Sequence, residues 1–375
     1  MPYKSRWSVT PPVTSLPSFI FTSPTALLPN DPILLDANCP EAHCFTLHTF
    51  REWSKRLAAG LVAAGLKTGE RVMLFSGNSI FSPIVVMGVI MAGGVYTSAN
   101  PAFTPRELAH QLKDSEATFL LAADNCIDRA LHGAKLAGVD LNRVFQFQDI
   151  SLDEETNRRE KFLSSHQLQH WKQLIAAPDV GKQFEWEEFR TPQLANRTII
   201  LIYSSGTTGL PKGVEASHYN IVANITQIIY VQGLDPRNNA GPNTRTLCFL
   251  PLYHGLGLMY YTWVAPKRGL RVYLMERFNL LEMVEYIQRY RITELLMVPP
   301  VVLAMSQHPL IKGGKYDLSS IVKVVCGAAP LGMETTIQFE KLWPNGAVKV
   351  RQAWGMSEYV CPATDTFVVH LLTRH

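Results

Sequence analysis

The sequence predicts an α/β protein with mainly parallel sheets and helices on both faces. Segments of helical periodicity alternate with short runs of β-branched residues along most of the 375-residue chain, which is the pattern of βα units. Hydrophobic residues make up 47% of the composition and charged residues 18%. A chain of this length and composition can bury a large core, so disorder is excluded as its dominant state.

The first third of the chain contains the clearest helix signals. Apolar residues recur at three-to-four spacing over 47–64, which predicts a helix, and Gly65 follows where a left-handed C-cap is expected. Thr104 as N-cap, a proline in the first turn and Glu107 as the capping-box partner predict a second helix over 105–113. The strands predicted after these two helices are 71–76 and 118–122.

The same alternation continues towards the C-terminus. The segment 151–182 differs, because it is polar and rich in charged residues, and we expect a surface excursion there. It is either a solvated helix and loop without a role or the mark of a subdomain boundary near 151–197. The later predicted strands are 198–203, 245–250, 270–275, 294–298, 321–326 and 348–352.

Charge and cysteine usage narrow the functional classes. Thirty-five Lys and Arg residues against 31 Asp and Glu residues give a net charge of +4. This small excess of positive charge does not indicate binding to nucleic acid or to a membrane surface. The longest apolar stretch, 83–98, is shorter than the roughly 18–20 residues of a spanning helix, so we expect no membrane insertion. Six scattered cysteines without a Cys-x-x-Cys pair indicate free thiols, and we expect a cytoplasmic protein that acts on small molecules.

The most informative motif is the segment 203–214, with the sequence YSSGTTGLPKGV. Its glycines allow a ligand to approach the backbone closely, its hydroxyls and amides can donate to phosphate oxygens, and Lys212 adds a positive charge. It follows an apolar strand, and a helix that Ser217 can cap comes after it, so we predict a strand-to-helix loop that binds polyphosphate. It is not a Walker A loop, because Pro211 and Gly213 stand where that motif needs Gly and Ser or Thr.

Residues 204–213 resemble the phosphate-binding loop of the adenylate-forming superfamily, which includes acyl-CoA synthetases, 4-coumarate:CoA ligases, luciferases and peptide-synthetase adenylation domains. Three later segments resemble further motifs of that superfamily, in the same order and at similar spacing. They are 250–254 (LPLYH), 326–332 (CGAAPLG) and 352–358 (QAWGMSE). The resemblance implies that residues 1–362 form the large N-terminal domain of the adenylate-forming fold, closest to the 4-coumarate:CoA ligase-like branch.

The resemblance implies an ATP-dependent acid:CoA ligase. Such an enzyme joins a small-molecule carboxylic acid to ATP as an acyl-adenylate and then passes the acyl group to coenzyme A, with Mg²⁺ as the metal. It implies catalytic roles for Lys212 and His254, and for Glu358, which would hold Mg²⁺ as a hard oxygen ligand. The nucleotide-binding residues that it implies are Ser204, Ser205, Gly206, Thr207, Thr208, Gly209, Lys212, Gly327, Ala328, Ala329, Pro330, Gln352, Trp354, Gly355 and Ser357.

The resemblance also implies an acyl pocket. Its expected lining is His254, Leu256, Tyr260, Ala328 and Ala353. Leu256 and its aliphatic neighbours make this pocket apolar, which is consistent with an aryl, cinnamoyl-like or fatty acid. Two positions depart from the family pattern: Ala353 replaces a glycine and narrows the floor, and Trp354 replaces a tyrosine whose ring covers adenine. A Trp face can stack in the same way.

The end of the sequence departs from the family pattern. A full member continues with a T-G-D element that binds ribose and with a second domain of roughly 100 residues that carries a catalytic lysine. No Gly-Asp dipeptide occurs in this chain, and the tail 363–375 does not resemble the family, so we expect the C-terminal lysine domain to be absent and the activity impaired by truncation. Its last residues, 373–375, are not the peroxisomal tripeptide that related ligases often carry.

Two alternatives remain open from the sequence. One is a non-catalytic nucleotide- or acid-binding remnant, either a pseudoenzyme or a truncated gene product, that keeps the phosphate loop. The other is a peptide-synthetase adenylation domain, which would require a carrier domain and an early aspartate for the amino group, and neither is evident.

Overall fold

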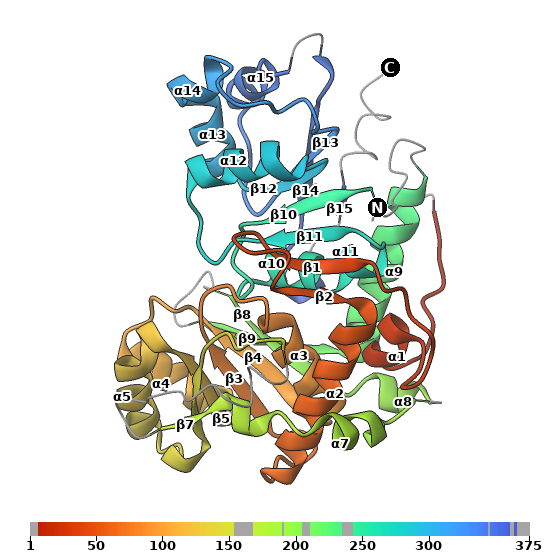
Figure 1. Ribbon diagram of the computed structural model, residues 1–375, viewed down its shortest axis with the longest axis vertical. Coiled ribbons are helices and arrows are strands. Elements are labelled where there is room, and N and C mark those ends of the chain that lie inside the picture. The colour runs from red at the N-terminus through yellow and green to blue at the C-terminus, as the bar shows by residue number, and fades with distance from the viewer. Residues whose placement is uncertain are drawn as a thin grey trace, which may run out of the picture.

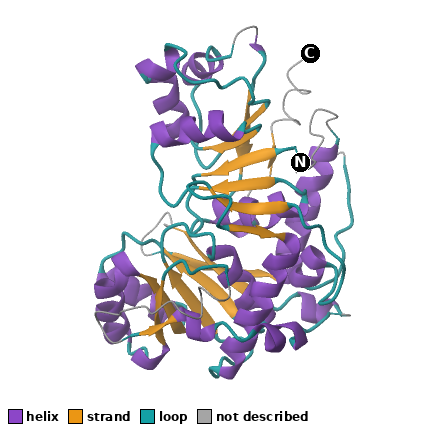
Figure 2. Ribbon diagram, viewed as in Figure 1, coloured by secondary structure: helices purple, strands orange, loops and turns teal. Residues whose placement is uncertain are grey.

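Two β-sheets, each surrounded by helices, make up the protein. The computed structural model describes residues 7–153, 168–189, 191–204, 211–234, 243–343, 346–360 and 364–365. Figure 1 shows a seven-stranded sheet in the lower half of the molecule and an eight-stranded sheet in the upper half. Figure 2 shows helices packed around both sheets, so the predicted α/β class with helices on both faces is confirmed.

The seven-stranded sheet is built mainly from the first half of the chain. Its strands are β3 (Arg71–Phe75), β4 (Val95–Ala99), β5 (Ala117–Ala123), β6 (Val144–Phe147), β7 (Gln169–His170), β8 (Thr198–Ser204) and β9 (Lys212–Ser217). They lie in the order β7-β6-β5-β3-β4-β8-β9. Every neighbouring pair is parallel except β8 and β9. The sheet is therefore mainly parallel, as predicted.

The eight-stranded sheet combines the N-terminal strands with the second half of the chain. Its strands are β1 (Pro32–Asp36), β2 (Cys44–Thr46), β10 (Arg245–Cys248), β11 (Arg271–Leu274), β12 (Glu294–Met297), β13 (Lys323–Cys326), β14 (Val350–Trp354) and β15 (Thr364–Asp365). The order is β15-β14-β13-β12-β10-β11-β1-β2, with antiparallel pairs only at its two ends. All eight strands predicted from the sequence are present, within a few residues of their predicted bounds.

The predicted helix caps are also confirmed. Helix α4 begins after Thr104, whose side chain accepts from the Glu107 backbone while the Glu107 side chain accepts from the Thr104 backbone. Helix α2 ends one residue before the predicted bound, and Gly65 follows with a φ of 86°. The helices are α1 (Leu16–Phe21), α2 (Leu47–Ala63), α3 (Ser82–Met91), α4 (Pro105–Asp114), α5 (Ile127–Ala137), α7 (Pro178–Gln183), α8 (Pro192–Ala195), α9 (His218–Gly233), α10 (Gly255–Met259), α11 (Ala265–Lys267), α12 (Leu280–Tyr290), α13 (Pro299–Gln307), α14 (Pro309–Lys312) and α15 (Met333–Glu340).

Part of the polar segment falls outside the structural description. Residues 154–167 of the expected surface excursion lie outside the described residues. Strands β6 and β8, which come before and after the range 151–197, belong to the same sheet. The subdomain boundary near 151–197 and the distinct character of the tail 363–375 stay predictions.

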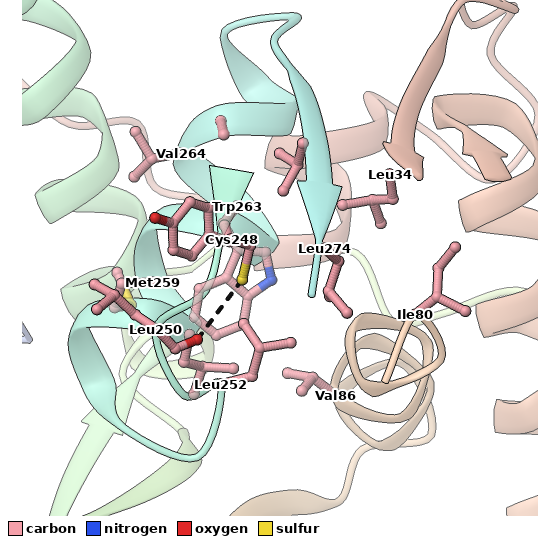
Figure 3. Packing of buried hydrophobic residues seen from close by; sticks show 14 of the residues in the cluster. Leu34, Ile80, Val86, Cys248, Leu250, Leu252, Met259, Trp263, Val264 and Leu274 are labelled. Carbon is pink, nitrogen blue, oxygen red and sulfur yellow. Dashed lines mark hydrogen bonds between the residues drawn. The ribbon is translucent and has the colours of Figure 1, made fainter. Parts of the chain in front are cut away.

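Helix α3 belongs to one core that both sheets share. All ten of its residues are buried, as expected for a helix that is apolar all round. Figure 3 shows Ile80 and Val86 in the same packed cluster as Cys248 and Leu274 of the eight-stranded sheet. The apolar stretch 83–98 is therefore a core helix followed by strand β4. Among the described residues, no helix is long and apolar enough to cross a membrane.

His218 joins α1 to α9 and makes folding stability depend on pH. Its Nδ1 atom accepts a hydrogen bond of 3.0 Å from the Leu16 backbone N–H, and burial lowers the pKa of His218 to about 3. The unfolded chain binds a proton on this residue below about pH 6.5, whereas the folded chain resists protonation. This contribution to stability is therefore complete above about pH 6.5 and is lost as the pH falls towards 3.

We expect His218→Gln, which keeps an uncharged acceptor, to lose less stability than the wild type between pH 7.5 and pH 5. Urea unfolding at several pH values measures this difference, and comparing the two proteins cancels the titration of all other groups. Parallel pH profiles for the two proteins would contradict the role assigned to His218.

Candidate nucleotide and acyl site

A cavity of about 620 Å³ brings together side chains from all four sequence motifs. Helix α9, the segment after β10 and the strands β12 to β14 enclose it, so its walls come from parts of the chain more than 150 residues apart. The predicted site residues that line this cavity are Ser204, His254, Leu256, Tyr260, Gly327, Ala328, Ala353, Trp354, Gly355 and Ser357. The structure thus places ten of the expected nucleotide and acyl residues around one space.

Parallel strand register explains why two of the motifs meet. Met297, Cys326 and Gln352 lie side by side on β12, β13 and β14, so the residues that follow β13 and end β14 are neighbours. Side chains at the carboxyl ends of parallel strands are a common place for ligand sites in α/β proteins. A Cβ atom on Gly327 would lie 3.2 Å from the Ala353 carbonyl oxygen, so a glycine here allows the two segments to approach closely.

The turn after β13 is held by a side chain from β14. Gln352 Nε2 donates to the Leu331 carbonyl at 3.3 Å, and Gln352 Oε1 accepts from the Leu331 N–H at 3.4 Å. Ala328 in this turn has a φ of 72°, a conformation that is unfavourable for a residue with a Cβ atom. Ala329, Pro330 and the predicted nucleotide ligand Gln352 lie outside the cavity lining. In this structure Gln352 therefore holds the turn in position, whereas a role as nucleotide ligand was predicted.

The phosphate loop connects different elements from those predicted. It connects two antiparallel strands, since Ser204 at the end of β8 pairs with Lys212 at the start of β9, and helix α9 begins only after β9. The prediction of a direct strand-to-helix loop was therefore wrong, although Ser217 does cap α9. Lys212 is exposed and lies outside the cavity lining, whereas the predicted ligands Ser205, Gly206, Thr207, Thr208 and Gly209 lie outside the described residues.

An exposed aromatic surface borders the cavity at the end of β14. Trp354 is 56% exposed and Tyr359 is 58% exposed, and their ring centroids are 5.9 Å apart. The two rings form an exposed aromatic pair next to the cavity, and a flat ring can stack on a planar base. The geometry at Trp354 therefore fits a nucleotide base.

Glu358 lies in a short 3₁₀ turn, Ser357–Tyr359, directly after the cavity residue Ser357. Asn224 of α9 donates to the Tyr359 carbonyl at 3.3 Å and fastens this turn to the helix. The Glu358 carboxylate is exposed and outside the cavity lining. An accessible carboxylate near the expected phosphate loop would suit Mg²⁺, which commonly takes one or two protein carboxylates together with phosphate oxygens.

His254 stands at the start of α10, and its side chain is exposed where it lines the cavity. Protein atoms around the ring nevertheless lower the pKa of His254 by desolvation, so the imidazole is neutral at pH 7. Its ring centroid lies 4.9 Å from that of Tyr253. A neutral imidazole can orient a carboxylate or cover the cavity mouth without adding a charge.

Sequence reasoning missed the residue that holds the His254 segment in place. Asn78 is buried; its Nδ2 atom donates to the carbonyls of Leu250 and Met275, each at 3.1 Å, and its Oδ1 atom accepts from the Leu252 N–H at 2.8 Å. These partners are more than 170 residues away in the chain, so no local pattern around Asn78 could reveal them. Asn78 acts as a positioning residue for the segment 250–254.

The family model described as "AMP-binding enzyme" matches residues 26–373. The chain belongs to this AMP-binding enzyme family. Two curated relatives of this family member are a phenylacetyl-CoA ligase, epaB, from Aspergillus niger and a 4-coumarate--CoA ligase from Pinus taeda. Each is 32% identical to it. The first similarity covers 96% of this chain and 64% of the relative, and the second covers 87% and 55%. The chain therefore spans less than two thirds of the length of these relatives.

Solved structures confirm the fold of this family member. A long-chain-fatty-acid-CoA ligase (FadD1) from Archaeoglobus fulgidus superimposes with a TM-score of 0.78 at 23% identity, over 96% of this chain and 67% of the other. The luciferase-like enzyme of the Zophobas morio mealworm gives a TM-score of 0.77 at 19% identity, over 96% and 77%. The adenylate-forming fold expected from the sequence motifs is therefore present.

Proposed function

We propose that this chain activates a carboxylic acid with ATP to an acyl-adenylate, the first half of an acid:CoA ligase reaction whose second half makes the CoA thioester. The observation that supports it best is one cavity whose lining includes residues of the expected adenine and acyl segments together with Ser204, the first residue of the expected phosphate loop. The names of the relatives, a phenylacetyl-CoA ligase and a 4-coumarate--CoA ligase, agree with this proposal.

The proposed chemistry demands positioning and charge neutralisation. A carboxylate is already a nucleophile at neutral pH, so attack on the α-phosphorus needs no general base. Lys212 and the hydroxyls of the phosphate loop would bind the phosphate oxygens, and Trp354 would cover the adenine. Mg²⁺, bound through Glu358, would neutralise charge on the phosphates. His254 would orient the acid at the mouth of the acyl pocket.

The proposed substrate is an aryl, cinnamoyl-like or fatty acid. Apolar side chains such as Leu256, Val298 and Val325 line much of the cavity, and its volume of about 620 Å³ can enclose a small or medium-sized acid. We propose a cytoplasmic location. One relative is described as a peroxisomal OPC-8:0-CoA ligase, from Arabidopsis thaliana, so an organelle location is the alternative.

The coenzyme A step needs more than the cavity described above. In the family resemblance, a lysine-bearing domain completes the adenylation site and the coenzyme A channel. We propose that residues 1–375 bind ATP and acid and that efficient thioester formation requires that domain. The competing proposal is a remnant that binds nucleotide or acid without catalysis.

Thermal unfolding with ATP, Mg²⁺ and candidate acids tests this proposal. ATP should raise the melting temperature, and phenylacetic, 4-coumaric or decanoic acid should raise it further, because each ligand binds only the folded chain. We expect Ala353→Leu, which fills the cavity floor, to remove the effect of the acid and keep the effect of ATP, with Ala353→Gly as the matched control.

Pyrophosphate release, measured in the same samples, separates the two proposals. Slow acid-dependent release from residues 1–375, which becomes faster when the C-terminal domain of a relative is fused, would support the ligase. Ligand binding with no release from either protein would support the remnant. Unchanged melting with ATP and with every acid would contradict both.

A further inference from the structure

Two oppositely charged side chains lie buried in the wall of the same cavity. Glu294 is the first residue of β12 and Lys323 is the first residue of β13, and the two are paired in the parallel register. Each is only 5% exposed, and both line the cavity. Lys323 Nζ lies 3.7 Å from Glu294 Oε2. Charged groups are rarely buried in this way unless they are paired or bind a ligand.

Arg268 and Tyr260 complete this charged cluster, which we define as Tyr260, Arg268, Glu294 and Lys323. The two terminal nitrogens of Arg268 donate to the two Glu294 oxygens at 3.1 and 3.2 Å, and the Tyr260 hydroxyl donates to Glu294 at 3.2 Å. Burial raises the pKa of Glu294, but Lys323 and Arg268 outweigh it and hold that pKa below its usual value. The cluster therefore contains two cations and one carboxylate.

Strand geometry places the charged cluster at the far end of the cavity. On β12 and its extension, Glu294, Leu295, Leu296 and Val298 line the cavity, and on β13 the lining residues are Lys323, Val325 and Gly327. Apart from Leu295, these are alternate residues, which share one face of a strand, so the cavity follows mainly that face of the sheet along both strands. Four residues at about 3.3 Å each separate the charged end from the nucleotide end by about 13 Å.

The contrast between the two ends restricts what can fill the cavity. A plain hydrocarbon chain that reached the charged cluster would remove water from ionic groups and provide no hydrogen bond in return. An oxygen on the chain could accept hydrogen bonds from Lys323 or Tyr260, which line the cavity and carry N–H or O–H donors. Arg268 lies outside the lining and adds its positive charge from behind Glu294. With two cations against one carboxylate, an acceptor or an anion is favoured there over a cationic group.

We infer that the acid activated at this site is an oxygenated one, with a hydroxyl, carbonyl or second carboxylate at the end remote from the reacting carboxyl group. This inference rests on the proposed function, since it needs the reacting carboxylate at the nucleotide end of the cavity. Lys323 is the residue that determines this specificity, because it combines a positive charge with a place in the cavity wall.

Calorimetric binding of three matched acids tests the inference. Decanoic, 10-hydroxydecanoic and decanedioic acid share one chain length and differ only at the remote end, and each is titrated into the wild type with a non-hydrolysable ATP analogue and Mg²⁺. We expect at least one of the oxygenated acids to bind about tenfold more tightly than decanoic acid. Decanoic acid binding as tightly as both oxygenated acids would overturn the inference, and so would no binding of any acid.

Variants at position 323 test the residue itself. Lys323→Met keeps the length of the side chain without its charge, and we expect it to remove the preference for the oxygenated acid. Lys323→Arg, the matched control, should keep the preference. The affinity for the ATP analogue should stay the same in both. A Lys323→Met protein with the wild-type preference would show that Lys323 does not determine specificity.

The ATP analogue separates failure of the inference from failure of the proposed function. Analogue binding together with a preference for decanoic acid would overturn the inference alone. The absence of analogue binding and of acid binding in the wild type would overturn the proposed function, and the inference with it. The preference is read on the wild type, so it remains testable even if a variant at position 323 does not fold.

Discussion

Replacing Lys212 with alanine is expected to weaken ATP binding by about ten- to a hundredfold. Hydrogen bonds to charged groups are worth about 1.5–3 kcal/mol, and a factor of ten in affinity corresponds to about 1.4 kcal/mol. Lys212 is exposed at the start of β9, directly after the phosphate loop, so the loss of its charge leaves no buried group unpaired. The melting temperature without ligand should therefore change little. Titration calorimetry with ATP and Mg²⁺ measures the effect.

Lys315→Ala is the matched control for this prediction. Lys315 is also exposed but lies in the turn after α14, outside the cavity lining, so its replacement removes the same net charge from another place. If both variants lose the same affinity, the effect is one of overall charge and the phosphate-loop assignment is wrong. Rising ionic strength should reduce the wild-type affinity more than the affinity of Lys212→Ala, because one charge contact is already lost in the variant.

Replacing Gly60 with alanine is expected to destabilise the fold by about 1–3 kcal/mol, the range found when groups are forced into packed interiors. Gly60 lies within α2, and a Cβ atom there would sit 1.9 Å from the Leu174 carbonyl oxygen. That backbone cannot easily retreat, because the next turn is tied to α2: Arg56 Nε donates to the Ala176 carbonyl at 2.8 Å, and the Ala176 N–H donates to the Arg56 carbonyl at 3.1 Å.

Gly233→Ala is the matched control for Gly60→Ala. Gly233 is the last residue of α9, and no atom of the described residues lies within 4 Å of the position of its Cβ atom. A methyl group there should leave stability unchanged or raise it by less than about 1 kcal/mol, through the better helix propensity of alanine. Urea unfolding of both variants gives the two free energies. An equal, small effect at both positions would mean that α2 and the segment 171–176 are less tightly packed than the structure indicates.

Local sequence signals predicted the secondary structure well because the physics behind them is local. The capping box between Thr104 and Glu107 forms within one helical turn, and the left-handed Gly65 follows directly from the absence of a Cβ atom. The error at the phosphate loop has a different origin. Residues 212–217 carry little apolar signal of their own, and they become strand β9 because β8 offers them backbone partners.

The site, too, combines features that the sequence predicts with features that depend on distant partners. The four motifs can be read in the sequence, and the resemblance that they carry predicted ten of the residues that line the cavity. The role of Asn78, the charged cluster around Glu294 and the part that Gln352 plays in holding a turn could not be predicted in this way. Each depends on partners that come from other strands or from distant loops.

Residue types at short spacing were enough to predict the α/β class, the main strands and several helix caps, and the resemblance of four motifs was enough to predict the adenylate-forming family. Three features could not be read from the chain: strands β1 and β2 join the second sheet, α3 lies in a core common to both sheets, and Glu294 and Lys323 are buried at the remote end of the cavity with Arg268 behind them. Burial and charge pairing depend on neighbours in space, which local sequence does not specify. Glu294 and Lys323 are 29 positions apart in the chain, and parallel register brings them together in the wall of a cavity that helix α9 and the segment after β10 complete.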